Sequence, residues 1–184
     1  MSRLGVLTGG GDCPGLNAAL RGLVARAQRG HQAEVVGILD GWDGLMEGRT
    51  RPLDRDAVRG LLQRGGTVLG TSRRDPYVHG EGGPSVAATL DREGLDALVV
   101  IGGDGTLRTA ARLVDEGIPI VGVPKSIDND VGGTDFTIGF DTAVQTATEA
   151  IDRITTTAES HDRVMVVEVM GRTQGWIATH AAIA

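Results

Sequence analysis

Four short apolar runs, each followed by a glycine-rich or acidic turn, constrain the fold of this chain most strongly. The runs lie at residues 4–7, 97–101, 118–123 and 163–169. Helical patterns separate them, and strands that alternate with helices form right-handed βαβ units with mainly parallel strands. Continuous valine and isoleucine runs are typical of parallel strands buried on both faces. The pattern therefore predicts an α/β fold: an open, mainly parallel sheet with helices on both faces, a Rossmann-like three-layer arrangement.

The other predicted elements lie between these runs. We expect helices at residues 17–28, 54–63, 84–92, 104–116, 141–159 and 175–183. A further strand is expected at 34–39, and residues 40–52 and 65–77 read as loops. Ligands bind beyond the carboxyl ends of parallel strands. The turns that follow the strands are therefore expected to gather along one edge of the sheet.

Composition excludes several classes of protein. Hydrophobic residues make up 40% of the 184 residues but aromatic residues only 3%, so the core must be aliphatic. The formal net charge of −6 argues against non-specific binding to nucleic acids or acidic membranes. Cys13 is the only cysteine, which rules out an intramolecular disulfide and fits a cytoplasmic protein. No apolar segment approaches the roughly 20 residues of a membrane-spanning helix.

The first glycine-rich turn, Gly9–Gly15, lies between a predicted strand and a predicted helix. Backbone N–H groups in such a turn, together with the helix dipole, suit a phosphate. A tight turn alone explains one glycine but hardly three consecutive ones. Pro14 occupies the third glycine position of the dinucleotide fingerprint, which disfavours a nicotinamide cofactor.

The second turn is Gly102–Thr106, directly after a strongly apolar run. Asp104 can hold Mg²⁺, because hard cations take oxygen ligands, and the Thr106 hydroxyl can donate to a phosphate. The alternative is that Asp104 only caps the following helix. The flanking glycines favour ligand binding, and the absence of a GxxxxGK[ST] sequence disfavours a P-loop enzyme.

The third turn, Pro124–Asp130, is the most informative. Asp128 can accept a proton from an attacking hydroxyl, as phosphoryl transfer requires, and Ser126 can bond to the same substrate. Lys125 is the only lysine of the chain, so any catalytic or phosphate-binding lysine must be this residue. The alternative is a surface turn in which Asp and Asn side chains bond to their own backbone, which explains Asn129 well.

Four arginines are candidates for binding phosphate oxygens, which suit the guanidinium group. Arg172 is the strongest, because it follows a predicted strand at the expected site edge. Of the neighbouring pair Arg73 and Arg74, one is expected to be a bystander. Arg163 is the fourth candidate.

These motifs together resemble the phosphofructokinases. The matching stretches are GVLTGGGDCPGLNAALRG, IGGDGT, PKSIDND and MGR, in family order and at family-like spacing. The resemblance covers about the first half of a family member. It implies phosphorylation of fructose 6-phosphate at its 1-hydroxyl, with MgATP as donor. It also implies a nucleotide-binding domain at residues 1–140 and the start of a sugar-phosphate-binding domain, largely missing, at 141–184.

The resemblance implies a role for each matching residue. The nucleotide site would be lined by Gly10, Gly11, Arg73, Arg74, Gly103, Asp104, Gly105 and Thr106. Asp104 would be the Mg²⁺ ligand. The sugar phosphate would meet Ser126, Ile127, Asp128, Arg163, Met170, Gly171 and Arg172. Asp128 would be the base and Arg172 would offset the charge of the transferred group, while Arg163 would contact the sugar phosphate of a neighbouring subunit.

Two positions bear on the phosphoryl donor, and they conflict. Gly105 leaves room for the α-phosphate of ATP, where pyrophosphate-using relatives typically carry Asp. Lys125 instead resembles the pyrophosphate-using pattern. A carboxylate beside the α-phosphate would exclude ATP, whereas a lysine only adds attraction, so ATP is favoured. Two further alternatives are an NAD or lipid kinase, which shares GGDGT but leaves PKSIDND and MGR unexplained, and a non-catalytic nucleotide-binding fragment.

The resemblance also implies an allosteric, cytoplasmic homo-oligomer, a dimer or tetramer when full length. Ala25 stands where relatives with a nucleotide effector site often carry a second arginine, so ADP activation is not assumed. The chain ends inside an apparent helix, which predicts a truncated protein that is inactive alone. We expect it to self-associate through apolar surface near Trp176 and the last helix.

Overall fold

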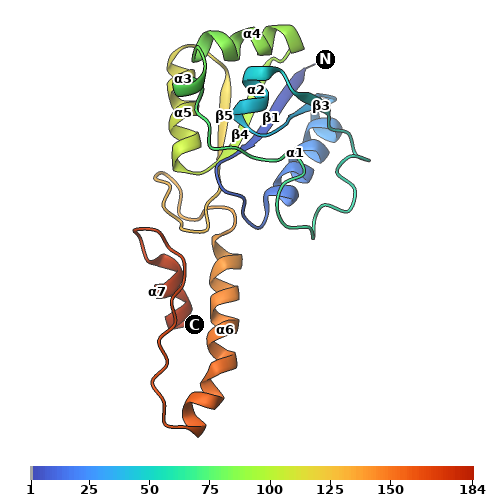
Figure 1. Ribbon diagram of the computed structural model, residues 1–184. Coiled ribbons are helices and arrows are strands. Elements are labelled where there is room, and N and C mark those ends of the chain that lie inside the picture. The colour runs from blue at the N-terminus through green and yellow to red at the C-terminus, as the bar shows by residue number, and fades with distance from the viewer. Residues whose placement is uncertain (1) are drawn as a thin grey trace. The chain divides into compact units, whose positions relative to one another are not determined.

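The computed structural model describes residues 2–184. The chain divides into two compact units, one ending at Pro124 and the other spanning Lys125–Ala184 (Figure 1). The domain boundary predicted from the sequence lies later, between residues 140 and 141. The turn before residue 140 bonds to itself: Thr137 Oγ1 donates to the Ser126 carbonyl (2.6 Å), and Ser126 N donates to the Ile138 carbonyl (3.1 Å).

The first unit contains the predicted sheet, with strand order β3-β2-β1-β4-β5. Its strands are β1 (Arg3–Gly9), β2 (Glu34–Ile38), β3 (Thr50–Pro52), β4 (Ala97–Gly102) and β5 (Ile120–Pro124). All neighbouring pairs are parallel except β2 and β3, which are antiparallel. The mainly parallel sheet is therefore confirmed.

Helices cover the sheet on both faces, as predicted. They are α1 (Leu16–His31), α2 (Trp42–Glu47), α3 (Pro76–His79), α4 (Gly83–Glu93) and α5 (Asp104–Asp115). One core cluster joins alternate strand residues to side chains of α2, α4 and α5: Leu7, Val36, Ile38, Leu98, Val100, Trp42, Leu45, Val86, Leu90 and Leu113. The intervening strand residues Val6 and Val35 are also buried, and α1 buries Leu20 and Val24. Burial on both faces explains the uninterrupted apolar runs.

Three predictions for the first unit are wrong. Residues 40–52, predicted as a loop, contain α2 and β3, because Asp40 and Gly41 adopt left-handed backbone conformations that turn the chain into α2. Residues 54–63, predicted as a helix, form successive turns in which Asp54 Oδ1 accepts from Ala57 N (2.7 Å). The run at 118–123, predicted as buried, forms β5 at the sheet edge, where Val121 is 61% exposed.

The second unit consists of α6 (Phe140–Ser160), α7 (Trp176–Ile183) and the segments around them. Phe140 and Ala147 of α6 pack with Ile177 and Ala181 of α7 in a small core. The predicted strand at 163–169 is not formed, because no described strand lies in position to pair with it, and these residues run without a ladder. Among residues 2–184, no helix is both long and apolar enough to cross a membrane.

Candidate functional site

The glycine-rich turn after β1 is joined to a distant loop by one backbone hydrogen bond and by hydrogen bonds from threonine side chains. Gly10, whose φ is 82°, donates from its N–H to the Ser72 carbonyl (3.0 Å) and accepts at its own carbonyl from Thr71 Oγ1 (2.5 Å). Thr8 Oγ1 donates to the Gly70 carbonyl (2.7 Å). The turn and the 70–73 loop therefore form one rim beyond the carboxyl end of β1.

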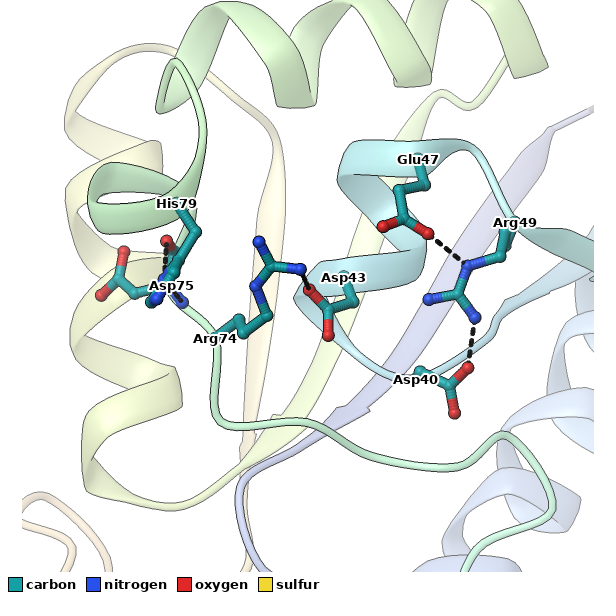
Figure 2. A network of polar contacts seen from close by, with 7 residues as sticks. All are labelled: Asp40, Asp43, Glu47, Arg49, Arg74, Asp75 and His79. Atoms are coloured by element: carbon teal, nitrogen blue, oxygen red, sulfur yellow. Dashed lines mark hydrogen bonds and ion pairs between the residues drawn. The ribbon is translucent and has the colours of Figure 1, made fainter.

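The two neighbouring arginines on this loop have different surroundings. A Cβ placed at Gly11 would lie 3.7 Å from Arg73 Nη2, so the Arg73 guanidinium extends along the glycine-rich turn. Arg74 instead forms an ion pair with Asp43 of α2 (3.0 Å), as Figure 2 shows. Arg73 therefore lies where a phosphate on the turn would be within its reach, while Arg74 is already engaged.

The acidic side chains around α2 were not predicted from the sequence, because the pattern of this region indicated a loop. Arg49 bonds to both Asp40 and Glu47 (Figure 2), and the hydrogen bonds to Asp40 and then to Glu47 raise the pKa of Arg49. With the Asp43–Arg74 pair, these contacts attach both ends of α2 to its surroundings. No sequence signal identified these partners, because each pair depends on the position of α2.

The glycines beside Thr106 have a packing role that was not predicted from the sequence. Thr106 is buried, and a Cβ at Gly9 or Gly102 would lie 2.6 or 2.5 Å from its side-chain atoms. Real Cβ contacts are not this short, so both strand ends need glycine next to Thr106. A Cβ at Gly105 would meet nothing within 4 Å, so the space beside Gly105 is open.

Asp104 begins α5 and is available as an oxygen ligand. Gly103, not Asp104, occupies the N-cap position, so the alternative role of Asp104 as a helix cap is not realised. Asp104 Oδ1 accepts from Arg108 Nε (3.0 Å) and the side chain is 29% exposed. Within residues 2–184 no cluster of three metal-binding side chains exists. Mg²⁺ is commonly held by one or two carboxylates together with substrate phosphates, so a single Asp104 fits such an ion.

In the second unit, Asn129 shapes the turn at 125–139. Its φ is 50°, its Nδ2 donates to the Asp135 carbonyl (3.0 Å), and its Oδ1 accepts from Thr137 N (2.9 Å). These bonds reach six and eight residues along the chain, whereas an Asx turn bonds two residues along, so Asn129 braces a wide loop. Asn129 therefore builds the turn, and the carboxylates of Asp128 and Asp130 take no part in these bonds.

The carboxylates of this turn have unequal environments. Asp130 accepts from Ser126 Oγ (2.8 Å) and from Arg172 Nη1 (2.9 Å). Ser126 Oγ also accepts from Asp128 N (3.1 Å), which links the two ends of the turn. Asp128 Oδ1 is buried and makes no hydrogen bond within residues 2–184.

These environments shift the two acids in opposite directions. Burial raises the pKa of Asp128, the negative charge of Asp130 adds to the rise, and the charges of Arg172 and Lys125 oppose it. Burial alone would raise the pKa of Asp130, but hydrogen bonds from Ser126 and Arg172 give a net lowering. Separated pKa values of this kind mark acid and base roles. Asp130 stays ionised, and Asp128 is the better proton acceptor.

The other residues expected to contact the sugar phosphate do not all lie near the Asp128 turn. Ile127 packs against the Phe140 core, Gly171 is buried, and the Met170 side chain is 73% exposed. Arg163 is exposed and follows the end of α6, whose 21 residues span about 30 Å from the turn. Arg163 is therefore not brought to the Asp128 side of this unit.

Known proteins are similar to this chain over almost its whole length. The chain is 58% identical over 182 residues to the pyrophosphate–fructose 6-phosphate 1-phosphotransferase of Amycolatopsis methanolica and equally to ATP-dependent 6-phosphofructokinase 3 of Streptomyces coelicolor. Each alignment covers 99% of this chain and 53% of the relative, so the chain spans about half the length of these curated relatives. The phosphofructokinase of Pichia pastoris in the T-state superposes with a TM-score of 0.90 at 38% identity, covering 99% of this chain and 21% of that one. With its residues 3–184 matching the family described as Phosphofructokinase, the chain belongs to the phosphofructokinase family.

Proposed function

We propose that this chain is the nucleotide-binding half of a protein that transfers a phosphoryl group from ATP to the 1-hydroxyl of fructose 6-phosphate, forming fructose 1,6-bisphosphate. The observation that carries the proposal is the carboxylate of Asp128, whose pKa is raised and whose buried Oδ1 makes no hydrogen bond to the described residues 2–184. A general base needs both an open lone pair and a pKa closer to the working pH. The names of the relatives support the substrate.

Asp128 and the residues around it have different roles in the proposed phosphoryl transfer. Asp128 takes the proton of the sugar 1-hydroxyl while the oxygen of that hydroxyl attacks the terminal phosphorus of the donor. The bond from that phosphorus to the leaving oxygen breaks. Asp130 holds the Arg172 guanidinium (2.9 Å) close to this turn. A cation held there offsets charge on the transferred group, which is the main protein contribution to phosphoryl transfer.

The residues that bind the nucleotide are proposed to lie in the turns of the first unit. Asp104 would hold Mg²⁺ with the donor phosphates, and the ion would neutralise their charge. Arg73 would bind a phosphate lying on the Gly10–Gly11 turn. Gly102 and Pro124, the last residues of β4 and β5, are register partners, so the turns leading to Asp104 and Asp128 leave the sheet at the same edge.

The choice of ATP as donor rests on the open space beside Gly105, where an added Cβ would meet no atom within 4 Å. Pyrophosphate is the second candidate, because Lys125 lies in the same turn as Asp128 and a pyrophosphate-dependent relative is equally similar. Assays of the longer protein with each donor separate the two. Turnover with pyrophosphate and none with ATP would reject ATP as the donor.

The decisive experiment replaces the base in the longer protein. Asp128→Asn keeps the side-chain shape and is expected to lower kcat by about 10² to 10⁴ with little change in KM for either substrate. Asp135→Asn is the matched control, because this exposed residue of the same turn contributes only its backbone carbonyl to the Asn129 bond. Full turnover by Asp128→Asn would remove the kinase proposal and favour another enzyme class sharing the GGDGT sequence.

The longer protein is further proposed to be a cytoplasmic homo-oligomer. Arg163, which lies far along α6 from the Asp128 turn, would then complete the sugar-phosphate site of a neighbouring subunit. Mixing the inactive Asp128→Asn and Arg163→Ala forms of the longer protein tests this. Recovery of part of the activity is expected if sites are shared, and no recovery contradicts sharing.

A further inference from the structure

Residues 64–73, which we call the arginine loop, carry Arg73 to the glycine-rich turn without forming a helix or a strand. Leu69, which is 1% exposed, is buried, whereas the other described residues of the loop are exposed or only partly covered. Gly66 and Gly70 have φ angles of 71° and 72°. Packing therefore fixes the middle of the loop, and the residues on either side of Leu69 need hydrogen bonds to keep one conformation.

The first half of the arginine loop is bonded to Asn17, the second residue of α1, which is 1% exposed. Asn17 Nδ2 donates to the carbonyls of Arg64 and Gly65 (3.0 Å each). Asn17 Oδ1 accepts from Val68 N (2.9 Å). Because a side-chain amide has two donor hydrogens and one acceptor oxygen, Asn17 directs both of its polar atoms to this loop. Asn17 therefore holds residues 64–68 to α1.

The second half of the arginine loop is bonded to Thr8, a fully buried residue of β1 that lies in register with Ile101 of β4. The Thr8 hydroxyl donates to the Gly70 carbonyl (2.7 Å), and its oxygen lies 2.9 Å from Thr67 Oγ1. A hydroxyl has one hydrogen, so Thr67 must be the donor of the bond between the two threonines. Thr67 Oγ1 also accepts from Leu69 N (3.2 Å). The single hydroxyl of Thr8 therefore holds residues on both sides of Leu69 to the sheet.

The bonds of Thr8 bear on Arg73 because the loop continues directly along the glycine-rich turn. The two residues before Arg73, Thr71 and Ser72, both bond to Gly10. Gly10 follows the end of β1, so these bonds join two irregular segments that can shift together. Thr8 instead belongs to a strand that is paired with both β2 and β4. Thr8 therefore attaches the turn and the loop, as one rim, to the sheet.

We propose that Thr8 and Asn17 are positioning residues, which hold the arginine loop so that Arg73 reaches a donor phosphate on the Gly10–Gly11 turn. The inference rests on the proposed function, in which Arg73 binds that phosphate. A guanidinium binds phosphate oxygens through directed N–H bonds, so a displaced loop weakens the contact. Thr8 and Asn17 are buried beneath the loop and act on the donor through Arg73.

Two substitutions of Thr8 in the longer protein separate its hydroxyl from its shape. Thr8→Val keeps the branched shape and removes the hydroxyl, so KM for ATP is expected to rise about tenfold while KM for fructose 6-phosphate stays within about twofold. Thr8→Ser keeps the hydroxyl and is expected to retain the wild-type KM for ATP. Thr89→Val is the matched control, because Thr89 is also 1% exposed or less but its hydroxyl bonds to Arg92 of the same helix. An equal rise of both KM values, or the same rise in Thr89→Val, overturns the proposal.

A double-mutant cycle shows whether Thr8 acts through Arg73. Arg73→Ala alone is expected to raise KM for ATP about 10- to 100-fold, because a hydrogen bond to a charged group is lost. In the Arg73→Ala background, Thr8→Val should add less than about twofold, since the guanidinium that the loop positions is gone. Equal effects of Thr8→Val in both backgrounds overturn the proposal. An unchanged KM for ATP in Arg73→Ala also overturns it, while the kinase proposal is judged separately by Asp128→Asn.

Hydrogen exchange measures the hold on the loop without any turnover. Thr8→Val is expected to speed exchange of the Leu69 amide, and Asn17→Ala that of the Val68 amide, by about two- to tenfold, because each loses a hydrogen-bonded neighbour. Thr8→Ser and Thr89→Val should leave both amides unchanged. Unaltered exchange in Thr8→Val and Asn17→Ala would show that these side chains do not hold the loop.

Discussion

Thr106 and the glycines beside it offer a stringent test of the structure. A Cβ added at Gly9 would lie 2.6 Å from Thr106 Cγ2 and 2.9 Å from its Oγ1, but 3.3 Å from its Cβ. Gly9→Ala therefore overpacks the end of β1, with an expected loss of about 1–3 kcal/mol in the free energy of unfolding. Thr106→Ala removes both close atoms, so in that background the cost of Gly9→Ala should fall below about 1 kcal/mol.

Gly102 makes the contrasting prediction. Its added Cβ would lie 2.5 Å from both Cβ and Cγ2 of Thr106. Thr106→Ala keeps the Cβ, so Gly102→Ala should cost about 1–3 kcal/mol in either background. Gly105→Ala, with nothing within 4 Å of the added Cβ, is the matched control. It should be neutral or stabilise by up to about 1 kcal/mol, because alanine favours helix.

Urea denaturation followed by fluorescence measures these changes in the first unit. Trp42 is 2% exposed in the core of that unit, whereas Trp176, in the second unit, is 43% exposed, so the Trp42 signal reports the relevant unfolding. The packing argument is refuted if Gly9→Ala costs the same free energy of unfolding in the wild-type and Thr106→Ala backgrounds. It is also refuted if Thr106→Ala relieves the cost of Gly102→Ala as much as that of Gly9→Ala.

Three further predictions concern the charged residues. Because burial raises the pKa of Asp128 above its unfolded value, the folded state binds more protons between the two values, and stability falls as pH rises through them. Asp128→Asn should therefore increase stability at neutral pH and remove this decline, as measured by denaturation across the acid range. Arg172→Gln removes a positive charge that lowers the pKa of Asp128, so ¹³C NMR titration of the carboxyl should give a higher pKa, and a lower one would contradict the electrostatic assignment. Asp43→Asn should destabilise the first unit by no more than about 1 kcal/mol, because the side chain of its ion-pair partner Arg74 is 47% exposed. A larger loss of stability in urea denaturation would contradict this.

The candidate site was only partly predictable from the sequence. Asp104 and Asp128 were identifiable because each follows an apolar run in a turn rich in glycine or polar residues. The contact of Asp130 with Arg172 was not, since the two residues are far apart in the chain and meet only through the fold of the second unit. The Asp43–Arg74 pair was missed for the same reason. The packing requirement for glycine at position 102 was not predictable either, because it comes from the side chain of Thr106.

The amino-acid sequence by itself determined the parallel sheet and the long helices, because burial on two faces or on one helical stripe leaves a pattern over many residues. It also placed Asp104 and Asp128 at strand ends. Only the tertiary structure decided the short elements α2 and β3, the edge position of β5, and the unpaired state of residues 163–169. These depend on which neighbours are present: a strand forms only beside another strand, and a carboxylate changes its pKa only when burial and charges from distant residues surround it.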